Sequence, residues 1–275
     1  MVRAFAQLSV IAALVLGLAG PSAFASCADL PRGTSAVARV LDAVTVILAD
    51  GTVVRLHGIL APDGADADAD AALWLPEADA RHALEALVAG RSVGLFSPRA
   101  RDRHGRLPAQ LAVVDGERTL WVQEELVALG HARVTAGLDD AACGQRLFTA
   151  ERAARSALRG LWRNAAYQPV LAEPPGPALA RADSFQIVSG TVLQAVDVRG
   201  TTYLNFGADW RRDFTAVVSP KVRQALSARG LDIRTLAGRH VEVRGWIERR
   251  NGPQIVVRSA DDLAIVLEAA EASKQ

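Results

Sequence analysis

The chain reads Ala38-Arg-Val-Leu-Asp-Ala-Val-Thr-Val-Ile-Leu48, then Asp50-Gly51-Thr-Val-Val-Arg-Leu-His-Gly-Ile-Leu-Ala-Pro-Asp63. Valine, isoleucine and threonine dominate both runs, as is typical of β-strands. Asp-Gly between two such runs is a strong hairpin signal, because both residues tolerate the positive φ of a tight turn. We therefore expect one strand over residues 36–48 and a second over residues 52–59.

The elements downstream of this hairpin complete a small barrel. Apolar residues recur at helical spacing from Glu77 to Val88, and Gly90 suits a helix end. Further strands are expected over residues 92–96 and 107–114, and helices around residues 120–129 and 147–161, each stopped by a glycine. The pattern predicts a β-barrel with flanking helices.

A second barrel is expected after a proline-rich linker at residues 172–183. The expected strands cover residues 185–198, 203–206, 214–218, 240–249 and 254–257, with a helix over residues 220–229. Five short strands with a helix between the third and fourth are typical of an OB-type barrel. The predicted fold class is mainly β with α (α+β), with domains at residues 26–171 and 184–268.

Length and composition limit the function classes. The 275 residues are 50% hydrophobic and carry 31 Lys plus Arg against 30 Asp plus Glu. Such a chain can build one large or two small cores, so bulk disorder is excluded. A net charge of +1 gives no general attraction to nucleic acid or anionic lipid, so anion binding must come from a local patch.

The first 25 residues predict export. Arg3 precedes an apolar stretch over about residues 8–19 and the small-x-small triplet Ala23-Phe24-Ala25, which together are typical of a cleavable secretory signal. The apolar stretch is too short for a confident membrane span, and we expect no transmembrane segment in the mature chain. The expected location is periplasmic or secreted.

Cys27 and Cys143 are the only two cysteines. In an exported protein such a pair favours one disulfide. A competing interpretation makes Cys27 a lipidated first residue, because Phe24-Ala25-Ser26 is similar to a bacterial lipobox. Two cysteines are too few for the usual structural zinc site.

Several linked motifs carry a resemblance to a known family. The opening hairpin is followed by Asp102-Arg-His-Gly-Arg106, by Leu126-Val-Ala-Leu-Gly-His-Ala-Arg-Val134, by Glu151-Arg-Ala-Ala-Arg155 and by Gly160-Leu-Trp162. In order and spacing, roughly residues 34–164 resemble the staphylococcal nuclease (thermonuclease-like) family. The resemblance implies an OB-fold barrel of the thermonuclease type.

The resemblance also implies a phosphodiester site, of which the chain keeps only a part. The two phosphate-binding arginines of the family fall on Arg55 and Arg106, and its water-activating glutamate falls on Asp63. The calcium aspartates are largely missing. Asp42 remains, but Val44 and Leu60 occupy the two ligand positions, and neither side chain offers an oxygen to a hard cation.

Further candidate nucleic-acid contacts lie outside this constellation. Arginines are densest between Ser97 and Arg106, and the second barrel interleaves aromatic residues with arginines. Such interleaving is typical of barrels that stack bases in a basic groove, although a solvated hairpin tip and core packing explain the same residues. The candidates are Arg99, Arg101, Arg103, Tyr203, Trp210, Arg211 and Arg212.

Three functions fit these observations. The first is an exported thermonuclease-fold protein with impaired or lost catalysis, which binds nucleic acid or protein and needs no cofactor. The second is an active secreted nuclease that uses Ca²⁺ to hydrolyse DNA or RNA. The third is a periplasmic scaffold with a protein or cell-envelope partner. Val44 and Leu60 favour the first.

Overall fold

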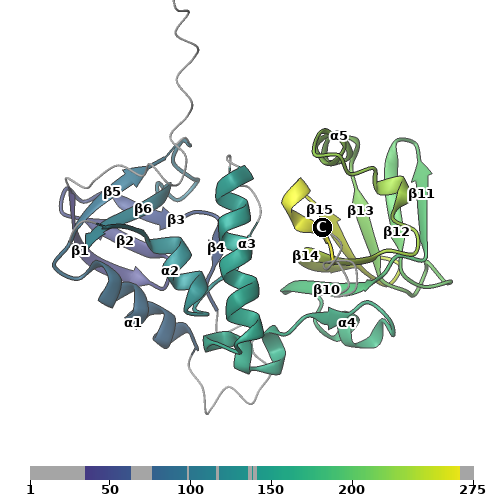
Figure 1. Cartoon of the computed structure of the whole chain (residues 1–275), viewed down its shortest axis with the longest axis horizontal. Helices are drawn as coiled ribbons and strands as arrows, with labels where there is room; N and C mark the ends of the chain where they lie inside the picture. The colour runs from purple at the N-terminus through teal and green to yellow at the C-terminus, as the bar shows by residue number, and fades with distance from the viewer. Residues whose placement is uncertain are drawn as a thin grey trace, which may run out of the picture.

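The computed structural model describes residues 35–266, apart from residues 63–75, 98, 116–117, 136–137 and 139–140. Two β-barrels lie side by side, with helix α3 between them (Figure 1). We call them barrel one and barrel two. The predicted signal segment, Asp63 and Cys27 lie outside the described residues.

Barrel one is closed by five strands. In chain order its elements are β1 (Ser35–Asp42), β2 (Thr45–Leu48), β3 (Val53–Leu56), β4 (Ile59–Leu60), α1 (Pro76–Val88), β5 (Ser92–Phe96), β6 (Leu107–Asp115), β7 (Arg118–Trp121), α2 (Val122–Ala128), β8 (Arg133–Val134) and α3 (Ala141–Ser156). The strands follow the order β3-β2-β1-β5-β6-β7, and the additional pairing of β3 with β6 closes the barrel. Alternate residues of these strands fill one apolar core, which α1 and α2 cover.

The expected single strand over residues 36–48 is wrong. A turn at Ala43-Val44 divides this run into β1 and β2, which pair antiparallel. The Asp42 carboxylate accepts the Val44 N–H at 2.8 Å, a local bond that stabilises the turn. The run of β-branched residues concealed this turn, because neither glycine nor proline marks it. The expected Asp50-Gly51 hairpin is confirmed, since β2 pairs with β3 across it.

Barrel two is a strongly curled sheet. Its elements are β10 (Phe185–Thr191), β11 (Gln194–Val198), β12 (Thr201–Asn205), β13 (Thr215–Val218), α5 (Pro220–Ala228), the 3₁₀ turn Ile233–Thr235, β14 (His240–Arg249), β15 (Pro253–Val257), the 3₁₀ turn Ala260–Asp262 and β16 (Leu263–Ile265). The sheet order is β11-β12-β13-β15-β14-β10-β9, with β16 on β14. Consecutive strands β10 and β11 therefore lie at opposite ends of the curl, as expected for a bent first strand in an OB-like barrel.

The segment predicted as a linker is folded. The 3₁₀ turns Gly160–Arg163 and Ala165–Tyr167 lead into β9 (Val170–Leu171), which pairs in parallel with β10. Helix α4 (Gly176–Ala180) follows, and it buries Ala178 in the core of barrel two. Residues 172–180 therefore pack on the second sheet instead of spacing the barrels apart. Proline content indicated irregular backbone, but composition does not show what such backbone packs against.

Buried charges join the two barrels. Arg244 of β14 forms an ion pair with Glu151 of α3 at 2.9 Å, and the two side chains are 7% and 1% exposed. Both groups also bond to β8: the Val134 N–H donates to Glu151 at 2.7 Å, and Arg244 donates to the Val134 carbonyl at 3.0 Å. One strand of barrel two is thereby fixed to a helix and a strand of barrel one.

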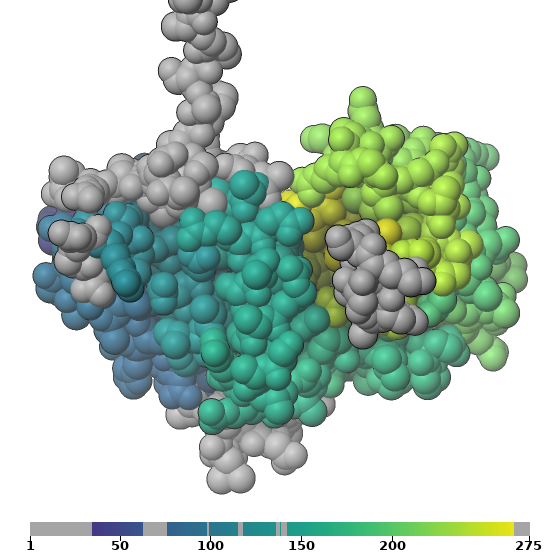
Figure 2. All heavy atoms as spheres, viewed as in Figure 1, coloured from purple at the N-terminus to yellow at the C-terminus, as the bar shows by residue number. Residues whose placement is uncertain are grey.

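Two further arginines extend this contact. Arg155 of α3 donates two hydrogen bonds to Glu242 of β14, at 2.7 and 3.1 Å. Arg133 of β8 donates to the Phe185 carbonyl of β10 at 2.7 Å. In the space-filling view the teal surface of α3 touches the yellow C-terminal strands (Figure 2). Charged and hydrogen-bonded groups therefore carry much of this interface.

Two glycines allow a close backbone contact within barrel one. Gly130 and Gly160 both have positive φ, and the Leu161 N–H donates to the Gly130 carbonyl at 2.8 Å. A Cβ added at Gly130 would lie 2.3 Å from the Arg159 carbonyl oxygen. This contact fixes the chain that leaves α3 against the end of α2.

Gly130→Ala should destabilise the chain by several kcal/mol. The substitution adds a steric clash with rigid backbone to the roughly 1–2 kcal/mol that a Cβ costs at left-handed φ. Gly90→Ala is the matched control, because Gly90 also has positive φ but open space around it. Urea unfolding of both variants tests the difference, and equal losses would contradict the close contact.

Glu151→Ala should cost about 3–5 kcal/mol, because it leaves the Arg244 guanidinium buried without its partner. Glu85→Ala is the control. It breaks the exposed Arg81–Glu85 pair, whose side chains are 42% and 39% exposed, and should cost about 0.5 kcal/mol or less. The free energies of unfolding are compared in denaturant. Similar losses in the two variants would show that the interface ion pair does not stabilise the fold.

Candidate functional site

Arg55 and Arg106 lie on the same outer face of barrel one. Parallel pairing places Arg55 of β3 opposite Pro108 of β6, and Arg106 precedes Pro108 by two residues. Side chains two residues apart in a strand point to the same face. The intervening side chains, such as that of Val54, fill the core. The strand register therefore places Arg106, the residue just before β6, close to β3, which carries Arg55.

The two guanidinium groups differ in their partners. Arg55 is half-buried and forms no hydrogen bond or ion pair with the described residues. Its cross-strand neighbour, Thr45, is 2% exposed, and the Thr45 Oγ1 has no hydrogen-bond partner in the described part of the chain. This face thus presents an uncommitted guanidinium, and the unsatisfied Thr45 hydroxyl beside it is buried.

Asp102 holds Arg106 in place. Its carboxylate accepts the Arg106 Nε–H at 2.8 Å, and also the backbone N–H groups of Arg106 at 3.0 Å and His104 at 2.8 Å. Partial desolvation raises the pKa of Asp102, but these hydrogen bonds outweigh it, and the net pKa lies below the ordinary value. Arg106 is thereby oriented and partly neutralised.

The described residues at the expected calcium position do not fit a calcium ion. Val44 is 4% exposed and packs in the core of barrel one, while half-buried Leu60 lies on β4, paired with β8. The Asp42 carboxylate already accepts the Val44 N–H through one oxygen. Ca²⁺ requires six to eight oxygen ligands, and two of the implied positions supply none. Asp63, the implied water-activating residue, lies outside the described residues.

The arginine cluster near Ser97 forms part of the turn before β6. Arg101 donates to the Gly105 carbonyl at 2.9 Å, and the Arg103 Nε–H donates to the His104 ring at 3.0 Å. Arg99, Arg101 and Arg103 are all exposed. They lie on barrel one with Arg106, not with the candidates of barrel two.

Barrel two contains a groove of about 470 Å³, which we call the Trp210 groove. It lies on the outer face of the sheet formed by β11, β12, β13 and β15. The predicted residues Tyr203 and Trp210 both line it, whereas Arg211 stacks on the Trp210 ring at 4.6 Å and Arg212 is largely exposed. Its lining residues are Gln194, Val196, Val198, Tyr203, Asn205, Trp210, Thr215, Val217, Arg250, Asn251, Gln254 and Val256.

Sequence reasoning missed Arg250, Asn251 and Gln254 as lining residues of this groove. Asn251-Gly252 forms the turn from β14 to β15, and only the parallel pairing of β13 with β15 brings this turn into the sheet that lines the groove. Asn205 could have been found, because strand alternation already places it on the same face as Tyr203.

Two other predictions concern the whole chain. Cys143 is buried on α3 and is not a free thiol, but Cys27 lies outside the described residues, so their pairing stays a prediction. In the described part of the chain, no helix has the length and apolar character needed to cross a membrane. The same part holds no cluster of three or more metal-ligating His, Cys, Asp or Glu residues.

Fold and site together define barrel one as an OB barrel of the nuclease type, with two arginines on one face. Comparison with protein families agrees: residues 53–164 match the family described as "Staphylococcal nuclease homologue". Residues 53–164 of barrel one are thus similar to staphylococcal nuclease. The match includes Arg55, Leu60 and Arg106, but begins after Asp42 and Val44. A search of curated proteins found no match.

Millimolar Ca²⁺ should leave the melting temperature (Tm) of the unsubstituted chain unchanged. The double variant Val44→Asp with Leu60→Asp should be less stable in EDTA, because it places a carboxylate in the core. Ca²⁺ should then raise its Tm, since a ligand at 100 times its Kd stabilises a protein by about 2.7 kcal/mol.

The variant Val44→Asn with Leu60→Asn is the control for this test, because it changes the shape similarly without adding charge. A calcium-dependent Tm increase in the unsubstituted chain would contradict the conclusion that its residues do not fit a calcium ion. The absence of any increase in the aspartate variant would mean that the backbone geometry no longer suits the ion.

Proposed function

We propose that this chain is an exported binding protein that holds phosphodiester chains on barrel one and does not cleave them by the calcium route of its family. The burial of Val44 carries this proposal. A side chain that packs in the core at the implied ligand position offers neither charge nor an open coordination position to a cation.

The binding half of the proposal rests on Arg55 and Arg106. Guanidinium groups suit phosphate because their planar donors match the spacing of its oxygens. Arg55 has no competing partner among the described residues. Asp102 keeps Arg106 directed along this face at the cost of part of its charge.

Loss of catalysis with retained binding follows from how these groups act. Hydrolysis of a phosphodiester needs an activated water and stabilisation of charge that develops in the transition state. Fixed arginines attract the phosphate in its ground state as well. They therefore support binding even without a metal ion and an activated water. The described residues do not fit Ca²⁺, so the proposed binding does not depend on it.

The proposed export rests on the sequence of residues 1–25. Periplasmic or secreted location agrees with the preference for disulfides in oxidising compartments and with the absence of a free thiol at Cys143. Mass spectrometry of chain purified from the periplasm or medium tests this. Cleavage after Ala25 and a two-dalton gain on reduction are expected, whereas a lipid on Cys27 would favour the anchored alternative.

Arg55→Ala and Arg106→Ala should each weaken the binding of labelled DNA to the mature chain. Loss of one phosphate contact should reduce the slope of log K against log salt by about 0.7 to 0.9. Arg81→Ala on α1 is the control, since it also removes one positive charge but from a different surface. Fluorescence anisotropy in EDTA at several salt concentrations measures all four proteins.

Cleavage assays on single- and double-stranded DNA and RNA complete the test. We expect intact substrates with Ca²⁺, Mg²⁺, Mn²⁺ or EDTA. Metal-dependent cleavage that Arg106→Ala abolishes would establish the active nuclease instead. If neither arginine variant changes binding, the scaffold with a protein or cell-envelope partner becomes the better explanation.

A further inference from the structure

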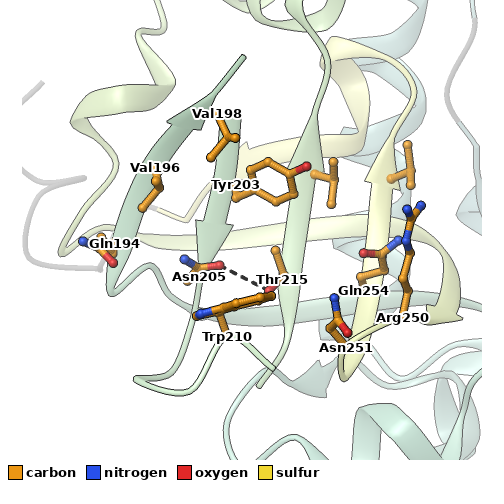
Figure 3. Close-up of a pocket in the computed structure, with 12 residues that line it drawn as sticks. Gln194, Val196, Val198, Tyr203, Asn205, Trp210, Thr215, Arg250, Asn251 and Gln254 are labelled. Carbon is orange, nitrogen blue, oxygen red and sulfur yellow. Dashed lines mark hydrogen bonds between the residues drawn. The ribbon is translucent and has the colours of Figure 1, made fainter. Parts of the chain in front are cut away.

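The Trp210 groove combines an aromatic end with uncommitted polar groups. Gln194, Val196 and Val198 lie on one side, Gln254, Asn251 and Arg250 lie on the other, and Trp210 lies across one end (Figure 3). The Trp210 side chain is 49% exposed, although its loop is well ordered by hydrogen bonds among Asp209, Arg212 and Asp213. A large, half-exposed aromatic ring in a groove is typical of a recognition surface.

Several polar groups of the groove have no partner in the described part of the chain, although Gln254 donates to Glu248 at 3.3 Å. Asn205 is 9% exposed, and its oxygen accepts the Thr215 hydroxyl at 3.3 Å, which leaves its NH₂ group without a partner among the described residues. The Tyr203 hydroxyl and the Asn251 amide are also unbonded in that part of the chain. These are donors and acceptors of the kind that match the edges of nucleobases.

Charge at the Trp210 end favours an anionic ligand. The groove is lined by one guanidinium, that of Arg250, and by no carboxylate. Its end is bordered by Arg211, stacked on Trp210, and by the largely exposed Arg212, which lies 3.9 Å from the Asp209 carboxylate. The turn at Gly252 packs against the Arg212 backbone, since a Cβ there would lie 2.6 Å from the Arg212 carbonyl oxygen. Arg212 and Arg250 therefore belong to adjacent loops.

We propose that the Trp210 groove binds single-stranded nucleic acid, with bases stacked on Trp210 and Tyr203 and phosphates toward Arg211, Arg212 and Arg250. A stacked, paired duplex cannot offer free base faces to these rings, so single strands are the ligand. A neutral saccharide would stack on Trp210 but would leave the Arg250 guanidinium, which has no ion pair among the described residues, without a counter-charge. This site is on barrel two and does not rest on Arg55 or Arg106.

The test uses the mature chain with Arg55→Ala and Arg106→Ala already introduced, so that the proposed site on barrel one does not contribute. An oligothymidylate of about eight nucleotides, within the usual site size of an OB fold, is compared with an abasic strand of equal length and charge. We expect the thymidylate to bind more tightly than the abasic strand, and more tightly than a duplex of the same sequence.

Trp210→Ala should weaken thymidylate binding by about 5- to 150-fold, the range for loss of one base stack, and Trp210→Phe should restore part of it. Trp246→Ala is the matched control: Trp246 is 50% exposed, but it lies on β14, where it contacts Phe185, and does not line the groove. The affinity of the Trp246→Ala variant for the thymidylate should stay within about twofold of that of the parent protein. Circular dichroism melts exclude unfolding, and Tyr203→Leu gives an independent second variant.

Three outcomes would overturn the proposal. Equal affinity for the thymidylate and the abasic strand would mean that the chain contacts only phosphates. Equal losses in the Trp210 and Trp246 variants would remove the groove from binding. Binding of a neutral probe such as chitotetraose, lost in Trp210→Ala, without binding of the thymidylate, would identify a saccharide site instead.

Discussion

The ion pair between Glu151 and Arg244 is the contact on which the arrangement of the two barrels depends. A buried charge is tolerable only when every part of it is compensated, and here a helix, a two-residue strand and a strand of the other barrel supply the compensation together. Arg155, paired with Glu242, repeats the same solution one turn further along α3. The contact therefore fixes the relative placement of the two barrels more strictly than an apolar interface would. Only one placement satisfies the four charged groups of Glu151, Arg244, Arg155 and Glu242.

Sequence alone predicted the local parts of this molecule well. The Asp50-Gly51 turn, helices α1 and α5 and strand β14 follow from turn chemistry and apolar periodicity, which are properties of neighbouring residues. The family resemblance singled out Arg55 and Arg106 together as site residues. The register of β3 against β6 places both on one face. Tyr203 and Trp210 were singled out by composition, and the curl of the second sheet brings them into one groove.

Long-range features could not be predicted in this way. Arg133, Glu151 and Arg244 lie up to 111 positions apart in the chain, and no spacing rule connects a buried arginine with its acceptor. Nor did the pattern reveal that the chain just before the proline-rich segment pairs with the second sheet, since the partner of β9 is the distant strand β10. The misfit of the calcium position could be predicted only in part. The sequence shows Val44 at a ligand position, but only the closed barrel shows that this side chain packs in the core.

Strand β14 has a consequence for any ligand that reaches both barrels. It contributes Arg244 to the interface and ends one residue before Arg250 at the rim of the Trp210 groove, a distance of about 20 Å along an extended strand. One continuous strand thus joins the contact with barrel one to the rim of the groove. A nucleic-acid strand bound on barrel one would meet the groove on the same folded chain, so its effective concentration there is set by the fold.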